Sequence, residues 1–541
     1  MKTIKGNIVD LHNETVFPGA VHIVEGVIAG IERERYWHDS YIIPGFVDAH
    51  VHIESSMLTP AEFARLAVVQ GTVATVSDPH EIANVLGPDG VHYMMENGAD
   101  VSFTFVFGAP SCVPASPFET SGAVIGADQT GELLGDARIG YLSEVMNFPG
   151  VIGGDREVLA KIELARRLGK PVDGHAPGLR GQKLRKYAAA GISTDHESFD
   201  IEEAREKISF GMKVQIREGS AARNLDALCP LIAEYPDHCM FCSDDKHPDD
   251  LVRGHINVLA ARAVRAGMDV MKVLRCACLN PVLHYGLDVG LLRKGDAADM
   301  VVVNNLEELV VLKTLVRGKT VAENGETCLV HRPAAPMNVF RANPKRPADF
   351  LVRKRSALMR VIEVIEGQLI TGGSLEAPIF EGDAAVCDAS RDILKVTVVN
   401  RYADAPPAVG FIRGFGLKNG AIASSVAHDS HNIIAVGVSD EMICDAVNLV
   451  IEKKGGISLV SDETKTVLPL PVAGIMSDGD GWDVAVKYSR LNVLAKELGT
   501  TLRAPFMTLS FMALLVIPKL KLSDRGLFDG ENFTFTDLFA E

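Results

Sequence analysis

The chain has 541 residues, of which 47% are hydrophobic and 23% charged, values that are ordinary for a globular protein. This length exceeds what one hydrophobic core usually supports, so the sequence predicts two or three domains. The formal net charge of -16 argues against a nucleic-acid partner, because phosphate binding requires a basic surface.

The N-terminus carries Lys2, Lys5 and Asp10 and no continuous apolar run, so we expect no secretory signal. The apolar stretch at 506–517 is too short to cross a bilayer. The 9 cysteines are scattered, and their odd number favours reduced thiols over a disulfide framework. We therefore expect a soluble, cytoplasmic protein without membrane contact. A homo-oligomer, most simply a dimer, is the general expectation for such proteins.

Residues 1–41 alternate apolar and polar side chains between turn signals, which predicts short antiparallel strands. These strands are too few to enclose a core. Residues 284–332 hold strand-like runs of the same kind, at 296–303, 310–317 and 319–324. The sequence therefore predicts one small β-sandwich domain built from 1–41 and 284–332, with a larger domain inserted between its two parts.

Residues 42–283 alternate strand-like with helical runs. The strands are predicted at 42–52, 73–78, 101–107, 140–146, 171–175, 193–197, 212–217 and 238–244, and helices between them include 60–70, 156–169 and 181–190. Eight such alternations are typical of a (β/α)8 TIM-like barrel. The irregular connection 110–137, rich in Gly, Pro and Ser, predicts an active-site loop.

The segment 331–347 contains four prolines, which predicts a linker or an extended arm. Beyond it, residues 349–541 mix strands, at 393–400 and 433–437, with helices, at 441–453 and 483–498. We expect a separate α+β domain there. The predicted fold class is α/β: a TIM-like barrel inserted in a split β domain and followed by an α+β C-terminal domain.

Two histidines end the first predicted barrel strand, in the run PGFVDAHVH at 44–52. His50 and His52 are spaced i, i+2, which in a strand directs both imidazoles to one face. Taken alone, such a pair fits packing as well as metal binding. Reactive groups of a barrel gather at the C-terminal ends of its strands. Four more predicted strands end in suitable side chains, namely Glu144, His175, His196 and Asp244.

Four histidines, one glutamate and one aspartate can surround two adjacent metal ions. With one carboxylate shared between the ions, such a set would generate hydroxide at neutral pH and polarise the group that the hydroxide attacks. The ligand types suit manganese, iron, zinc or cobalt, so they do not select a metal. The strand ends therefore predict a binuclear hydrolytic centre.

Several motifs resemble the adenine deaminase family of the amidohydrolase superfamily. The run at 44–52 and GDAADMVVV at 295–303 carry the resemblance to the superfamily. The motifs ESSM at 54–57, DPHEIAN at 78–84, GHAPG at 174–178, REGS at 217–220 and CSDD at 242–245 resemble adenine deaminases in particular. The likeness continues through GLKNGAIA at 416–423 and AHDSHN at 427–432, so it spans nearly the whole chain.

This resemblance implies hydrolytic deamination of free adenine to hypoxanthine and ammonia, as in purine salvage. It implies that the two histidines of the first strand and Asp244 hold one divalent ion, and that His175 and His196 hold the other. Glu144 would bridge the ions. Related hydantoinases and dihydroorotases use a carboxylated lysine on this strand, and no lysine occurs between residues 140 and 147. We expect Mn2+ or Fe2+, with Zn2+ as an alternative.

In the implied reaction, a metal-bridging hydroxide attacks C6 of adenine. Asp244 would pass the hydroxide proton to the departing amino group, and a second proton must reach a ring nitrogen. Glu218 is the first candidate for that contact and His80 the second; a loop salt bridge or a supporting role fits each of them equally well. The neighbouring Asp245 is expected to be structural, because adjacent strand residues face opposite ways.

The remaining substrate contacts rest on the resemblance alone. Met57, Glu218 and Ser220 are expected to shape the purine site. His428 is expected to reach the barrel mouth from the C-terminal domain as part of a lid, and a simple polar turn is the other interpretation of its segment.

Three alternatives compete with this interpretation. One is another cyclic-amide or aminopurine hydrolase of the same superfamily. A second is a non-catalytic scaffold, which the presence of a competent residue at all six ligand positions disfavours. The third is a cytidine-type deaminase zinc site, formally suggested by His52-x-Glu54 and Cys239-x-x-Cys242. Those cysteines fall in an apolar strand, so we expect them to pack.

Overall fold

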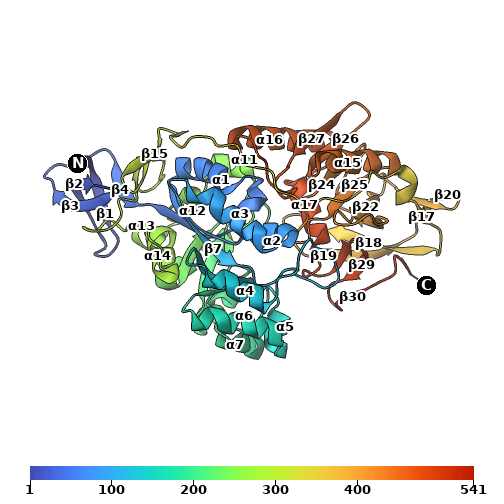
Figure 1. Cartoon of the computed structure of the whole chain (residues 1–541), viewed down its shortest axis with the longest axis horizontal. Coiled ribbons are helices and arrows are strands. Elements are labelled where there is room, and N and C mark those ends of the chain that lie inside the picture. Colours follow the sequence, from blue (N-terminus) through green and yellow to red (C-terminus); the bar gives the residue numbers. More distant parts are fainter. Residues whose placement is uncertain (541) are drawn as a thin grey trace.

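In a computed structural model, which describes residues 1–540, the chain forms three parts in a row (Figure 1). The N-terminal strands lie at one end, the central α/β domain follows, and the C-terminal domain lies at the other end. Within the described residues, no helix combines the length and the apolar character that a membrane span requires.

The N-terminal strands share one sheet with strands from far along the chain. The sheet runs in the order β16 (Glu326–Thr327), β15 (Lys319–Glu323), β14 (Val311–Val316), β13 (Met300–Val303), β4 (Tyr41–Pro44), β1 (Lys2–Asp10), β2 (Thr15–Val24) and β3 (Val27–Arg33). Ile8, Ile42 and Met300 are buried in its own small core. Both chain segments therefore build one β domain around the ends of the inserted domain.

The run that we predicted as one barrel strand, 42–52, is divided at Gly45. Its first part, β4, pairs with β1 and β13 in the β domain, whereas its second part, β5 (Phe46–Val51), belongs to the barrel. A Cβ at Gly45 would collide with the Val73 side chain, so the crossing between the two sheets requires glycine. The barrel therefore begins at 46 rather than at 42.

Eight parallel strands form the central domain. They are β5, β6 (Thr72–Ser77), β7 (Thr104–Ala109), β8 (Ile139–Val145), β9 (Val172–Gly174), β10 (Thr194–Asp195), β11 (Lys213–Arg217) and β12 (Cys239–Cys242). The amide of Ser193 donates to the Val172 carbonyl at 2.8 Å, which joins β9 to β10. The amide of Asp244 donates to the His50 carbonyl at 3.0 Å, which brings the last strand back to the first. The domain is thus TIM-barrel-like.

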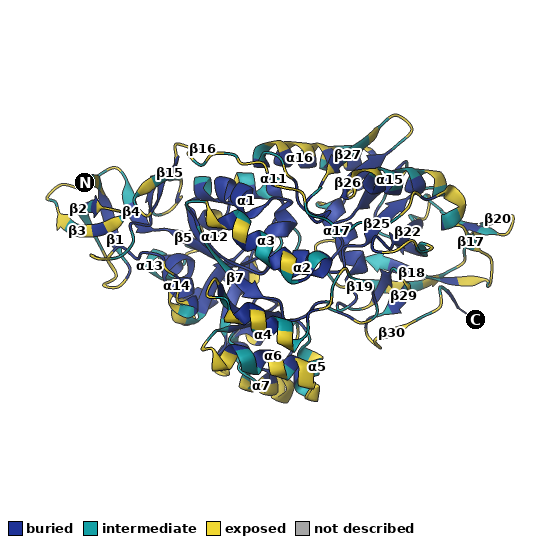
Figure 2. Cartoon of the chain, viewed as in Figure 1, coloured by how far each residue is buried: buried dark blue, intermediate teal, exposed yellow. Residues whose placement is uncertain are grey.

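Helices cover the outside of these strands, with their polar faces exposed and the strands buried (Figure 2). They include α1 (Pro60–Ala67), α3 (Pro88–Ala99), α4 (Ala127–Gly135), α6 (Arg156–Arg167), α7 (Gly181–Ala189), α8 (Ile201–Ser209) and α12 (Ile256–Arg265). The connection before α4, which we predicted to be an active-site loop, contacts the Glu144 carbonyl through Ser111 Oγ and also contacts the C-terminal domain. Thr120 there accepts a hydrogen bond from Asn432 at 2.8 Å and donates its amide to Asp524 at 2.9 Å.

The C-terminal domain is built on a mixed sheet. Its central strands are β18 (Leu358–Val364), β23 (Ala408–Arg413), β22 (Leu394–Val399), β25 (Ile433–Gly437), β24 (Ala421–Ser424) and β26 (Gly456–Val460). The helix α16 (Gly481–Glu497) packs against α1 and α11 (Pro248–Arg253) of the barrel. Leu66 of α1 and Tyr488 of α16 are buried in one continuous core. The domain that we expected to be separate therefore shares its core with the barrel.

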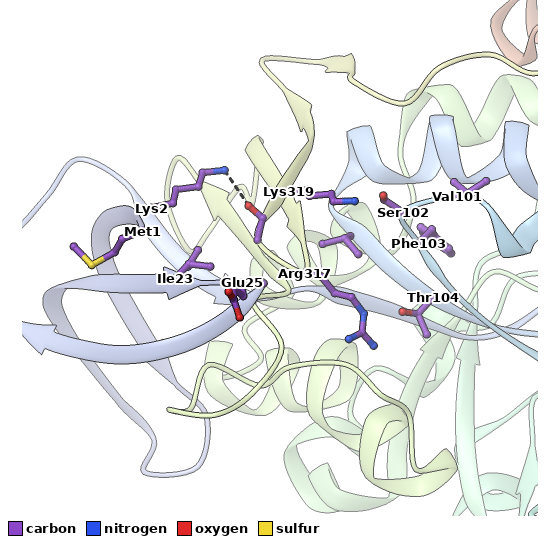
Figure 3. A pocket seen from close by; sticks show the side chains of 13 residues that line it. Met1, Lys2, Ile23, Glu25, Val101, Ser102, Phe103, Thr104, Arg317 and Lys319 are labelled. Atoms are coloured by element: carbon purple, nitrogen blue, oxygen red, sulfur yellow. Dashed lines mark hydrogen bonds between the residues drawn. The ribbon is translucent and has the colours of Figure 1, made fainter.

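A cavity of about 660 Å³ lies between the β domain and the N-terminal end of β7 (Figure 3). Lys2, Arg317 and Lys319 line it on the side of the β domain, and Val101 and Thr104 line it on the barrel side. Because the reactive groups of such barrels gather at the opposite, C-terminal ends of the strands, this cavity lies on the structural face of the barrel.

Candidate active site

All six predicted metal ligands lie together in the structure, buried at the C-terminal ends of the barrel strands. Each is the second-to-last residue of a strand or one of the first two residues after it. They are His50, His52, Glu144, His175, His196 and Asp244. Their strands are neighbours around a closed sheet, which explains why residues so far apart in the sequence converge.

Glu144 lies between the imidazoles. Its Oε2 is 2.7 Å from His175 Nδ1 and 3.3 Å from His196 Nε2. Its Oε1 is 3.3 Å from His52 Nε2. Burial alone would raise the pKa of this carboxyl, but the surrounding histidines outweigh burial and hold the pKa well below its usual range. Glu144 thus contacts histidines of both predicted halves of the centre.

Asp244 faces the other side of the cluster. Its Oδ1 is 3.4 Å from His50 Nε2 and 3.2 Å from His52 Nε2, while Arg217 Nη1 donates to its Oδ2 at 2.7 Å. Burial would raise the pKa of Asp244, but Arg217 and the histidines hold it well below its usual range. The group is therefore a carboxylate at neutral pH.

Several ring nitrogens of the cluster have no hydrogen-bond partner among the described residues. Both nitrogens of His50 and Nδ1 of His196 are buried in this way. A buried polar atom without a partner is costly, and a cation that accepts its lone pair would remove that cost. Imidazole and carboxylate groups are common ligands of divalent transition metals. The donor set therefore fits a divalent metal centre.

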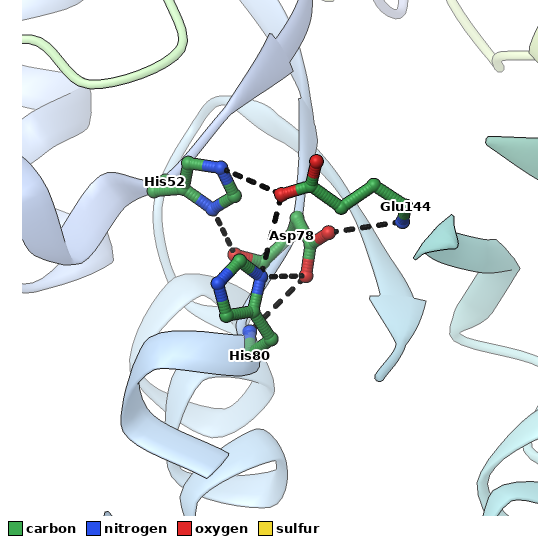
Figure 4. Close-up of side chains that lie close together, drawn as sticks. All are labelled: His52, Asp78, His80 and Glu144. Carbon is green, nitrogen blue, oxygen red and sulfur yellow. Dashed lines mark hydrogen bonds and ion pairs between the residues drawn. The ribbon is translucent and has the colours of Figure 1, made fainter. Parts of the chain in front are cut away.

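Asp78 and His80 extend the cluster next to Glu144 (Figure 4). His80 Nδ1 is 3.2 Å from Asp78 Oδ1 and 3.7 Å from Glu144 Oε1, and His52 Nδ1 donates to the Asp78 carbonyl at 3.2 Å. Burial opposes the charged form of His80, but Asp78 and Asp429 outweigh it and raise the pKa of His80 well above its usual value. Sequence reasoning found His80 but missed Asp78, although Asp78 is the last residue of the second predicted strand.

Glu197 and Arg217 form a buried ion pair beside the cluster that sequence reasoning also missed. Arg217 Nη2 is 3.1 Å from Glu197 Oε2, and its Nη1 contacts both Glu197 and Asp244. Glu197 Oε1 is 3.5 Å from His196 Nε2. Both residues end predicted strands, so the rule that found the metal ligands would have found this pair as well.

The C-terminal domain contributes His428 to the site. His428 lines the cavity at the cluster, and its ring stacks on Phe511 with 4.9 Å between the ring centroids. Its Nδ1 pairs with Glu81 of α2 (His80–Leu86), whose other oxygen is 2.5 Å from His431 Nε2. The segment around His428 therefore lies at the barrel mouth, as a lid would.

Comparisons with known proteins agree with this geometry. The family described as "Amidohydrolase family" matches residues 41–321, which is more than half of the chain, and "Adenine deaminase C-terminal domain" matches residues 368–534. An adenine deaminase from Salinibacter ruber is 56% identical over 541 residues, which cover 100% of this chain and 99% of that protein. The chain belongs to the adenine deaminase family. The resemblance seen in the motifs is thereby confirmed.

Other members of the adenine deaminase family are similar over the same length. The adenine deaminase from Sulfurovum sp. is 55% identical over 535 residues, covering 99% of each chain. The one from Methanosarcina mazei is 51% identical over 554 residues, covering 100% of each chain.

Three residues that the adenine deaminase resemblance suggested as substrate contacts do not join the cluster. Glu218 accepts from Arg262 Nη1 at 2.5 Å, so it forms the loop salt bridge that was its alternative interpretation. Ser220 Oγ donates to Asp250 at 2.7 Å, and Met57 is buried in the hydrophobic core. None of the three lines the cavity at the cluster.

Asp245, which we expected to be structural, lines the cavity instead. The strand β12 ends at Cys242, and Asp244 has a φ of 53°, in the left-handed region. The alternation of side chains therefore stops, and Asp244 and Asp245 both face the cavity. Ser55 Oγ donates to Asp245 Oδ1 at 2.5 Å. Cys239 and Cys242 are buried in β12, as expected for packing residues.

Proposed function

We propose that this protein hydrolyses adenine to hypoxanthine and ammonia at a binuclear divalent metal centre. The observation that carries the proposal is the buried cluster of four histidines with Glu144 and Asp244, in a chain of the adenine deaminase family. Deamination replaces the C6 amino group with oxygen, so it requires an activated water and a path for protons.

The cluster provides ligands for both ions. As the family resemblance implies, one ion would be held by His50, His52 and Asp244, the other by His175 and His196, with Glu144 shared between them; Asp244 Oδ1 is near both His50 and His52, and Glu144 groups with His175 and His196. Such ions activate water as a nucleophile and polarise the group that is attacked. We propose Mn2+ or Fe2+, with Zn2+ as the alternative. The ring nitrogens of His50, which have no hydrogen-bond partner among the described residues, and the position of Glu144 among the histidines support metal binding here, whichever of these ions is bound.

Two residues move protons in this proposal. Asp244 takes a proton from water and passes it to the departing amino group. Arg217 Nη1 donates to Asp244 Oδ2, so it holds the carboxyl that carries the proton in position. His80 replaces Glu218 as the residue that protonates a ring nitrogen, because His80 lines the cavity and Glu218 does not.

The test uses purified protein that is stripped with a chelator and reloaded with Mn2+ or Fe2+. Incubation with adenine should shift the ultraviolet spectrum to that of hypoxanthine, and the stripped protein should be inactive. Turnover of guanine or a hydantoin in place of adenine, with metal present, would contradict the proposed substrate. A reloaded protein that retains no metal would contradict the proposed centre.

A further inference from the structure

The cavity at the metal ligands is narrow in this structure, with a volume of about 30 Å³. A second cavity of about 580 Å³ lies between the barrel loops that follow β9 to β11 and two segments of the C-terminal domain, 367–370 and 516–518. Glu197, Leu369 and Val516 line both cavities, so the two are direct neighbours.

The larger cavity suits a flat and partly apolar molecule. Phe148, Pro177 and Phe199 line its barrel side, and Phe199 is 57% exposed. An exposed aromatic side chain in a concave surface is typical of a ligand site. At its inner end lie Glu197 and Arg217, the ion pair that contacts Asp244. The cavity therefore leads from the surface to the metal ligands.

A buried lysine holds the segments that separate the two cavities. Lys521 of β28 (Leu520–Ser523) donates to the carbonyl of Leu369 at 2.7 Å and to the carbonyl of Phe511 at 2.9 Å. Leu369 and Phe511 both line the cavity at the cluster. Burial lowers the pKa of Lys521 to about 7. Burying an amine costs free energy unless it is hydrogen-bonded. The two hydrogen bonds of Lys521 therefore hold the backbone of Leu369 and Phe511 in place.

We propose that the 580 Å³ cavity is the passage through which adenine reaches the metal centre, and that Leu369, held in place by Lys521, is the gate between passage and centre. This inference rests on the proposed function for the identity of the ligand. The gate itself can be tested without turnover, because a planar chelator that enters through the 580 Å³ cavity must pass Leu369 to reach the metals.

The experiment measures how fast dipicolinate, a planar aromatic chelator, removes Mn2+ from the loaded full-length protein. Leu369→Trp fills the gate and should slow metal loss at least about fivefold, which corresponds to about 1 kcal/mol in the barrier. It should also lower kcat/KM for adenine more than kcat. Lys521→Met frees the Leu369 segment and should speed metal loss. The matched control is Ile379→Trp, on the exposed strand β20 (Ile379–Glu381), which lines neither cavity.

Slower chelation in Leu369→Trp than in Ile379→Trp supports the gate, whether or not adenine is the substrate. Equal rates of metal loss in both Trp variants and the unaltered protein overturn it. If Leu369→Trp does not fold, Leu369→Ala replaces it in the test. Leu369→Ala widens the gap between the two cavities and is expected to speed metal loss. An unchanged rate of metal loss in Leu369→Ala and Lys521→Met would then overturn the inference. If the variants change the rate of metal loss as expected but the unaltered protein does not deaminate adenine, only the proposed function is overturned.

Discussion

Glu144 is the residue at which the two halves of the site meet, since its oxygens reach His52 on one side and His175 and His196 on the other. Glu144→Gln keeps the shape but removes the charge, so it should weaken retention of metal at least about tenfold. Metal content after dialysis measures this. Glu132→Gln, exposed on α4, is the matched control. Full occupancy by two ions in Glu144→Gln would show that the shared ligand lies elsewhere.

A substitution at Asp244 can distinguish its proposed role in proton transfer from its proposed role in metal binding. Asp244→Asn retains an oxygen toward His50 and His52 but cannot take up a proton, so kcat should fall about 10² to 10⁴-fold while most of the metal stays bound. Steady-state kinetics with parallel metal analysis distinguishes the two effects. Asp226→Asn, on the short helix α9 (Leu225–Leu228), changes an exposed aspartate and serves as the control. An active Asp244→Asn enzyme would rule out the proton-transfer role.

The buried Lys521 predicts that the stability of the folded protein rises with pH above neutrality. Its pKa is about 7 in the folded protein against an ordinary value of 10.5, so between these values only the unfolded chain binds the proton. The free energy of unfolding must therefore rise with pH in this range. From pH 7 to pH 9 the unaltered protein should gain about 2 kcal/mol more than Lys521→Met. Urea unfolding at both pH values measures the difference, and equal gains would contradict a depressed pKa.

The sequence predicted that the six proposed metal ligands lie together because one rule governs their placement: a strand end fixes both the position and the direction of a side chain. Glu218 shows where the rule stops. It follows β11, but its partner Arg262 comes from a helix 44 residues further along the chain. Whether a loop carboxylate such as Glu218 contacts the cluster or a surface arginine depends on tertiary packing. The residues around Glu218 in the sequence do not show which contact forms.

At the level of elements, the strand β9 depends on Gly174, which precedes the proposed metal ligand His175. A Cβ at Gly174 would collide with the Thr194 carbonyl on β10 and would lie 2.6 Å from Ile192. Gly174→Ala should push β9 away from β10 and displace His175, so it should lower both thermal stability and metal content. Gly135→Ala, at the end of α4 with nothing near its Cβ position, is the control and should change neither. Normal metal content in Gly174→Ala would contradict the placement of His175.

Elements were predictable to different degrees. The barrel strands were found because each is a short apolar run bounded by turn residues. The division of the first run into β4 and β5 was not found, because Tyr41 to Val51 reads as one continuous strand. The close approach of Gly45 to the Val73 side chain explains why a glycine stands where the chain changes sheets.

At the scale of the whole molecule, the proposed metal ions should stabilise the fold, since ions that bind only the folded chain shift the unfolding equilibrium. The shift reaches about 4 kcal/mol when the free metal exceeds its dissociation constant a thousandfold. Chelation should therefore lower the melting temperature, and added Mn2+ should restore it. Calorimetry checks this, with Glu144→Gln as the variant that should respond less. Equal melting temperatures with and without metal would contradict buried ligation.

The arrangement of the domains was the least predictable feature. The buried residues of α1 and α16 look like those of any amphipathic helix, so nothing in Leu66 or Tyr488 shows that the two helices share one core. The expectation that His428 reaches the barrel mouth rested only on the resemblance of its segment to the family.

The split β domain has a consequence for biosynthesis. The strand β4 pairs on one side with β1 and on the other side with β13, where Ile43 lies opposite Val301. The second edge of β4 stays unpaired until β13 has been synthesised. A ribosome must complete the whole barrel before that partner emerges. Until then, the nascent chain carries an open apolar strand edge, which is a template for aggregation. The order of synthesis therefore makes the barrel the first unit able to fold, and the N-terminal strands, although made first, complete their sheet only after it.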